Sequence, residues 1–310
     1  MDALTNTTVA VTLGMAGYKY WGRRGLVWVV LAANAPELER LVYLAGPAVW
    51  VKSAYGAGHS LLMAPLLGLL LALIAVRRLR NARAAAAAVA VGLGSHLLLD
   101  MVSGAGLRIF WPLSSQFYGL RLLARYDLLT LAILLAALIG PRLLNLVNRD
   151  MGAPAYSPQT PARIGLACIL LLLAVRGAAK FSLEDRAQEE TGSSFALDPS
   201  ALSPLTWYVV SDAGPAYTVE EITPWSTGPT MRFRKPQSNR AFETAADTPL
   251  AQAFLQIAQF PHYTLERGEK GMLVRIRDLR FYAPAGQRKE FSVEIEVTPQ
   301  LEVVGQRAQM

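Results

Sequence analysis

The sequence has almost no cysteine and very little histidine. Its 310 residues include one cysteine, Cys168, and three histidines. A single cysteine excludes both a disulfide within the chain and a metal site built from several cysteines. Charged residues make up only 17% of the chain, which is few for an ordinary soluble protein. Because histidine is so rare, each histidine inside an apolar segment is informative about function.

The start of the chain lacks the features of a cleavable signal peptide. Asp2 precedes the first basic residue, and the first apolar stretch, residues 8–18, is interrupted by Gly14 and Gly17. A signal peptide has basic residues followed by a continuous apolar core. We therefore expect this segment to be a short or partly buried membrane helix.

Apolar residues are abundant and unevenly distributed. They make up 53% of the chain, the mean hydropathy is +0.29, and the excess lies in the N-terminal part. This distribution predicts a mostly α membrane helical bundle at residues 1–180, a polar linker at 181–204 and a small extracytoplasmic α+β domain at 205–310. The net charge of +7 is typical of arginine-rich cytoplasmic loops, so we expect the lipid bilayer, and no nucleic acid, as a partner.

About six apolar segments are candidates for membrane helices, at residues 8–18, 25–35, 59–76, 84–102, 126–147 and 164–175. Basic residues concentrate in alternate connections between them: Lys19, Arg23 and Arg24; Arg77, Arg78, Arg80 and Arg83; Arg142, Arg149 and Arg163. The positive-inside rule places these connections in the cytoplasm. We therefore predict a multi-pass protein of the bacterial inner membrane, with everything after about Lys180 outside the cytoplasm.

His96 and Asp100 stand four residues apart inside the fourth apolar segment. On a helix they share one face, and ionisable groups inside a membrane are costly enough to suggest a function. The predicted topology places further polar side chains near the same outer interface: Asn6, Glu37, Glu39, His59 and Asp127. Imidazoles together with carboxylates suit zinc, manganese or iron. Two alternatives remain open, a polar pair that locks two helices together and a proton or ion path.

A resemblance to a known family is carried by four segments: MDALTNTTVAVTLGMAGY, LAANAPELERLVYLAGP, AYGAGHSLLMAPLLGLLL and HLLLDMVSGAGLRIFWPLSSQFYG. They are similar to the motifs of the YdjM family of LexA-regulated, inner-membrane, metal-dependent hydrolases. The last segment is the most specific of the four. The tail segments PLTWYVV, AFLQIAQFPHYTLE and VRIRDLRF resemble the extracytoplasmic tail of longer members, so the likeness spans nearly the whole chain.

The chain departs from the family pattern at several positions. His59, His96 and Asp100 match it, whereas Asn6 and Ala54 stand where the family has histidines. Tyr55 and Gly58 stand where it has arginine and threonine, and Glu37 and Glu39 stand where it has aspartates. With two imidazoles missing, the resemblance implies at most one tightly held ion.

The resemblance implies a hydrolase that uses a metal-activated water on an ester or phosphoester. The expected substrate is a small molecule or a lipid, and the lipid rests only on the predicted depth of the site. The implied cofactor is a divalent metal, zinc or manganese. The implied site residues are His59, His96, Asp100, Glu37 and Asp127 as ligands, with Glu37 or Glu39 as the general base. Two other functions remain open, a catalytically degenerate member whose tail binds a periplasmic protein and, less favoured, a transporter.

The tail has the alternation expected of a small α+β domain. Strands are predicted at residues 207–210, 217–222, 273–281 and 291–297, and a helix at 248–260 with Pro249 in its first turn. His262 follows this helix, and a lone histidine there is more often structural or solvated than a ligand. Asp278 and Arg280 are expected to make contacts at a strand end or between domains.

Overall fold

The structure is a computed structural model that describes residues 1–104, 106–151, 154, 157–191, 194–236, 239–268, 271–282 and 291–309. The chain forms two compact units, which are described separately below. The helical unit comprises Met1–Leu38, Tyr55–Ala178 and Ala201–Pro204. The sheet unit comprises Glu39–Ala54, Ala179–Ser200 and Leu205–Met310.

Six helices account for the six predicted apolar segments: α1 (Ala3–Ala16), α2 (Tyr18–Asn34), α4 (Met63–Leu79), α5 (Ala82–Val102), α6 (Leu128–Asp150) and α7 (Gln159–Thr191). Within the described residues, three of them are long and apolar enough to cross a membrane: α5, α6 and α7 over Gln159–Glu189. The others have 14 to 17 residues, below the roughly 20 that a full crossing needs. Each predicted segment thus contains a helix, but only three of these helices, over the residues that the structure describes, are candidate membrane spans, so about six membrane helices remain a prediction.

The surfaces of α4 and α6 are typical of helices that face lipid. Large apolar side chains are exposed on both: Leu66, Leu69, Leu70 and Leu73 on α4, and Leu135, Ile139, Leu143 and Leu146 on α6. In water such a surface would be an association site, whereas in a bilayer it is matched by the hydrocarbon. These helices therefore support a membrane location.

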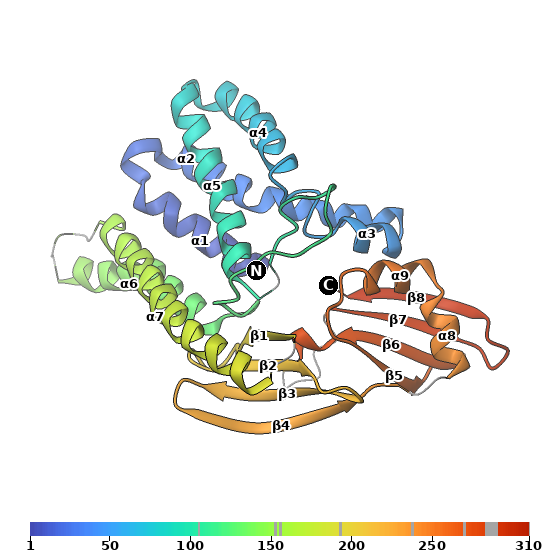
Figure 1. Cartoon of the computed structure of the whole chain (residues 1–310). Helices are drawn as coiled ribbons and strands as arrows, with labels where there is room; N and C mark the ends of the chain where they lie inside the picture. The colour runs from blue at the N-terminus through green and yellow to red at the C-terminus, as the bar shows by residue number, and fades with distance from the viewer. Residues whose placement is uncertain are drawn as a thin grey trace. The chain divides into compact units, whose positions relative to one another are not determined.

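Helix α5 lies at the centre of the packing, beside α1, α2 and α4 (Figure 1). A Cβ atom on Gly92 would lie 2.2 Å from the carbonyl oxygen of Val29, so only glycine allows this approach of α5 to α2. Next to it, small side chains bring α1 into the same seam, because Ala10, Ala33 and Ala88 share a buried cluster with Val29. Close packing through small residues is the usual arrangement of membrane helices.

The sheet unit contains two four-stranded antiparallel sheets, each with its strands in chain order (Figure 1). The first sheet comprises β1 (Phe195–Pro199), β2 (Trp207–Asp212), β3 (Ala216–Thr223) and β4 (Ser226–Arg234). The second comprises β5 (Pro261–Arg267), β6 (Met272–Asp278), β7 (Ser292–Val297) and β8 (Val303–Gln309). The short helices are α3 (Pro47–Ser53), α8 (Arg240–Ala246) and α9 (Pro249–Leu255), with 3₁₀ turns η1 (Ala35–Ala45) and η2 (Leu279–Phe281).

The end of α7 packs on the first sheet. Leu183 and Ala187 share a buried cluster with Trp207, Val209 and Ile222. Most of the segment predicted as a linker, residues 181–204, is therefore regular structure, since α7 continues to Thr191 and β1 follows. The polar composition of this stretch reflects a helix with one buried face and not a flexible connection.

The predicted strands correspond to β2, β3, β6 and β7, and the predicted helix corresponds to α9, with Pro249 in its first turn. Strands β1, β4, β5 and β8 and helix α8 are additional. Asp278 accepts hydrogen bonds from the backbone N–H groups of Gln259 and Phe260, and Arg280 donates to Asp278 and to Ile257 O. The RDLRF segment thus ties the end of β6 to the chain that enters β5.

Candidate metal centre

Three side chains far apart in the sequence meet in the interior of the helical unit. The Nε2 atoms of His59 and His96 lie 2.9 Å apart, and each lies 3.3 Å from Oδ2 of Asp100. The residues are 4%, 0% and 1% exposed, so the group is shielded from water. The structure thus brings together the three predicted ligands that match the family motifs.

Helix α5 supplies two of the three side chains. Ala88, Gly92, His96 and Asp100 follow one another at intervals of four, so they lie along one face of α5. The close approach at Gly92 turns this face toward α2, and the cluster with Ala10 turns it toward α1. The His96 imidazole and the Asp100 carboxylate are therefore held in a protein seam and not on a surface that faces lipid.

His59 comes from the irregular segment that precedes α4 and not from the helix itself. This segment is held by two backbone hydrogen bonds, from Arg108 N to Tyr55 O at 2.9 Å and from Leu61 N to Ile109 O at 2.9 Å. Gly58 packs against Pro36, where an added Cβ would lie 2.9 Å from the Pro36 carbonyl oxygen. These contacts fix the backbone on both sides of His59, so its imidazole meets α5 without a helix of its own.

Two further contacts define the surroundings of the group. The α-amino group of Met1 donates to Oδ1 of Asp100, which leaves Oδ2 for the two histidines. His96 Nδ1 is buried and finds no hydrogen-bond partner among the described residues. Because a neutral imidazole nitrogen without hydrogen can only accept, two Nε2 atoms at 2.9 Å need either a proton or a cation between them.

The spacing of the three atoms fits a bound ion. A tetrahedral ion with bonds of about 2.0–2.1 Å separates its ligand atoms by roughly 3.3–3.4 Å. The observed separations of 2.9, 3.3 and 3.3 Å are close to that face of a tetrahedron. Two imidazole nitrogens and one carboxylate oxygen form a donor set suited to zinc, iron or manganese. The residues present therefore fit a divalent metal.

The other predicted site residues lie outside this group. Asp127 caps α6, where Oδ1 accepts from Thr130 N at 2.9 Å, and Oδ2 accepts from Arg176 Nη1 at 2.5 Å. Both oxygens of Asp127 are thus engaged in structural contacts, which makes it a cap and ion-pair partner rather than a member of the group. Glu37 follows Pro36, the residue packed against Gly58, whereas Glu39 belongs to the sheet unit.

Two contacts were not predicted from the sequence. The Met1 amine beside Asp100 leaves no pattern in the sequence, because the contact joins residues 99 positions apart. The sequence did contain an indication for Arg176, because this residue lies directly after an apolar run within helix α7. A basic residue in such a position needs an anionic partner, and the acidic residue at the start of the preceding helix, Asp127, provides it.

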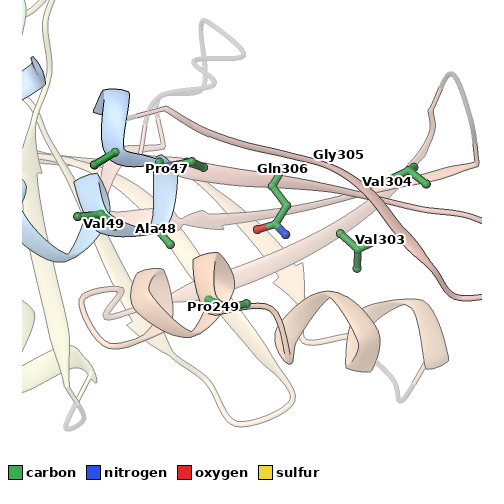
Figure 2. A pocket seen from close by; sticks show the side chains of 10 residues that line it. Pro47, Ala48, Val49, Pro249, Val303, Val304, Gly305 and Gln306 are labelled. Atoms are coloured by element: carbon green, nitrogen blue, oxygen red, sulfur yellow. The ribbon is translucent and has the colours of Figure 1, made fainter. Parts of the chain in front are cut away.

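The sheet unit has its own groove, of about 540 Å³, bordered by α3, α9 and β8. Figure 2 shows its lining, which includes Pro47, Val49, Pro249, Val303 and Gln306. Gln306 is the one side chain with hydrogen-bonding groups among these lining residues, and none of them titrates. This groove therefore lacks the groups that acid–base or metal chemistry requires.

The fold and the buried group together define a class, a membrane helical bundle that carries an internal His–His–Asp cluster and an appended sheet unit. Comparison with known families assigns it further. The family model of the YdjM inner membrane protein matches residues 1–183, and the chain belongs to this family. The match ends within α7, so it covers the buried group and all of the helical unit except Ala201–Pro204. No curated protein and no solved structure matches the chain.

Proposed function

We propose that this member of the YdjM family is a membrane-embedded, metal-dependent hydrolase of esters or phosphoesters. The observation that carries the proposal is the triangle of His59 Nε2, His96 Nε2 and Asp100 Oδ2, whose edges suit one divalent ion. Zinc or manganese held there would act as a Lewis acid on the substrate and on a water molecule. A buried cluster of this composition in a membrane protein is more costly than an apolar core, which favours a functional role.

The chain's own residues have distinct tasks in this proposal. The two imidazoles and Asp100 hold the ion, and the contact between the Met1 amine and Asp100 Oδ1 fixes the orientation of the carboxylate. Glu37 is the general base that takes a proton from the attacking water. Its support is its place in the chain, one residue after Pro36, which packs against the backbone of Gly58 beside His59.

The position of the cluster favours a substrate from the outer membrane interface. Asp100 lies near the C-terminal end of α5, and Arg83 lies near its beginning. Arg83 and Asp100 are 17 positions apart, which corresponds to about 25 Å of helix, close to the thickness of a bilayer core. If the arginine-rich connection is cytoplasmic, the cluster lies near the outer interface, where a lipid ester or phosphoester is accessible.

A second candidate function is favoured by one contact. The Met1 amine already places a positive charge on Asp100, and a proton between the two histidines would satisfy both Nε2 atoms. In that case the cluster is a polar lock between helices, no ion binds, and the family member acts through its sheet unit on a protein partner.

Metal analysis of the purified full chain separates the two candidates. We expect one zinc or manganese ion per chain in the wild type and a large loss in His96→Ala. Ser95→Ala is the matched control, because Ser95 is also buried and donates only to the backbone oxygen of Gly92. Equal metal content in wild type and His96→Ala, or none in either, would refute the hydrolase. Unfolding of His96→Ala without any metal in the wild type would support the lock.

A further inference from the structure

Asn6 is a buried polar side chain that the His–His–Asp triangle does not use. It is 1% exposed, and neither Oδ1 nor Nδ2 finds a hydrogen-bond partner in the part of the chain that the structure describes. The other buried polar side chains of α1 are satisfied, since the hydroxyls of Thr8 and Thr12 donate to the carbonyls one turn earlier. Asn6 is therefore the exception on its helix.

Two contacts set the depth of Asn6 along α5. The Met1 amine meets Asp100 near the end of α5, whereas Ala10 shares a cluster with Ala88, about three turns earlier on α5. Helix α1 thus runs antiparallel to α5. Asn6 lies midway between Met1 and Ala10, so it lies at the level of the turn of α5 that carries His96.

The direction of the side chain follows from helix periodicity. Asn6 and Ala10 are four residues apart and share one face of α1. Ala10 faces the seam with α2 and α5, as its cluster shows. On α5, Ala88 and His96 lie on the one face that looks into the same seam. Asn6 and His96 therefore point into one seam at one depth.

We propose that the Asn6 carboxamide oxygen is a fourth protein ligand of the metal centre, an inference that rests on the proposed function. An amide buried without partners costs about 1–3 kcal/mol, which a bound cation would offset. Carboxamide oxygens bind hard divalent ions. The site then has two nitrogen and two oxygen donors from the protein. Because manganese prefers oxygen ligands, the second oxygen reduces the difference in affinity by which the site favours zinc over manganese.

The test is metal binding by the full chain in detergent after removal of metal with a chelator. Titration calorimetry with Zn²⁺ and with Mn²⁺ gives the affinity, and thermal unfolding of the metal-free protein gives the stability. We expect Asn6→Leu to weaken binding of either ion by ~10-fold or more and to raise the unfolding midpoint without metal, because an unsatisfied amide is removed. Asn6→Asp keeps an oxygen donor and adds charge, so it should bind tighter and be less stable without metal.

Thr12→Val is the matched control, because Thr12 is fully buried on the same helix and bonds only within it. Its metal affinity should equal that of the wild type. Unchanged affinity in both Asn6 variants, alongside a loss in His96→Ala, would overturn the role of Asn6 and leave the proposed hydrolase standing. A metal-free Asn6→Leu protein that is less stable than wild type would likewise assign Asn6 to structure. A wild type that binds neither ion would overturn both proposals.

Discussion

Asp127 and Arg176 form an ion pair in the interior of the helical unit, with 2.5 Å between Oδ2 and Nη1 and side chains that are 1% and 2% exposed. The pair joins the start of α6 to α7, and Arg176 also donates to Leu122 O at 3.1 Å. Taking two charges out of water costs several kcal/mol each, so such a pair is retained only where the geometry compensates both. Each partner therefore depends on the other.

Loss of one partner should be far more damaging than loss of both. Asp127→Asn leaves the Arg176 guanidinium buried without its counter-charge, and we expect the free energy of unfolding to fall by about 3–5 kcal/mol. The double variant Asp127→Asn with Arg176→Met should recover most of that loss. Chemical unfolding in detergent measures both. Metal content relative to folded protein should stay at the wild-type level in the double variant; a loss there would make Asp127 a ligand after all.

Gly92 and Gly94 offer a matched pair for testing the approach of α5 to α2. An added Cβ on Gly92 would lie 2.2 Å from Val29 O, whereas Gly94 has nothing within 4 Å. Gly92→Ala must push the helices apart, and we expect a loss of about 1–3 kcal/mol together with weaker metal binding. Gly94→Ala should be neutral or stabilise the protein by up to about 1 kcal/mol. Equal effects of the two changes on unfolding would contradict the close packing.

Sequence patterns predicted where the long helices lie and that His59, His96 and Asp100 meet. The i, i+4 spacing placed His96 and Asp100 on one face, and the motif around His59 added the third residue. The sequence could not predict the loop geometry that brings His59 to α5, because this geometry depends on backbone hydrogen bonds that join residues 55 and 61 to residues 108 and 109. The polar residues predicted at the same depth do not all join the buried His–His–Asp group. Asp127 instead forms an ion pair with Arg176.

In the sheet unit, alternation of apolar residues identified only the strands with a buried face. Strand β4 is almost entirely exposed: only Met231 and Phe233 are half-buried, and Pro229 lies just before them, so the alternation is too short to predict a strand. Strand β8 is likewise an edge strand with exposed residues. Helix α3 has seven residues and packs with α9 and β8, which lie about 200 and 256 residues further along the sequence. Short helices and exposed edges depend on such distant contacts, which local patterns do not record.

His262 should make the sheet unit sensitive to acid. It is the second residue of β5, is 8% exposed and packs edge-on against Phe233. Burial, and then the charge of Arg277, lower the pKa of His262 to about 4. In the unfolded chain the pKa is about 6.5, so between these values only the unfolded state binds the proton. Stability is therefore present above pH 6.5 and is lost as the pH falls toward 4, by at most about 3 kcal/mol.

The matched variant for this prediction is His262→Gln, which keeps a hydrogen-bonding side chain but does not titrate. Unfolding midpoints measured by circular dichroism at several pH values should show a shallower decline from pH 6.5 to 4 in the variant than in the wild type. Parallel curves for the two proteins would mean that His262 is protonated in the folded state.

The last prediction concerns topology, which decides from which side substrate reaches the buried cluster. Arg163, near the start of α7, donates to Ala16 O at the end of α1, at 3.2 and 3.3 Å. Two of the three arginine-rich connections therefore lie at one end of the helical unit, opposite Met1 and Asp100. The positive-inside rule then places that end in the cytoplasm and the chain after α7 outside it.

Cysteine labelling in intact cells tests this arrangement. Cys168 is the one native cysteine, so Cys168→Ser gives a clean background for two probes on exposed residues. The first probe, Ser226→Cys, replaces a residue of β4. The second probe, Ala82→Cys, replaces a residue at the arginine-rich start of α5. We expect a membrane-impermeant maleimide to label Ser226→Cys in cells with a permeable outer membrane, and Ala82→Cys only after the inner membrane is opened. The opposite pattern would place the cluster near the cytoplasmic interface, where a lipid substrate from the outer leaflet could not reach it.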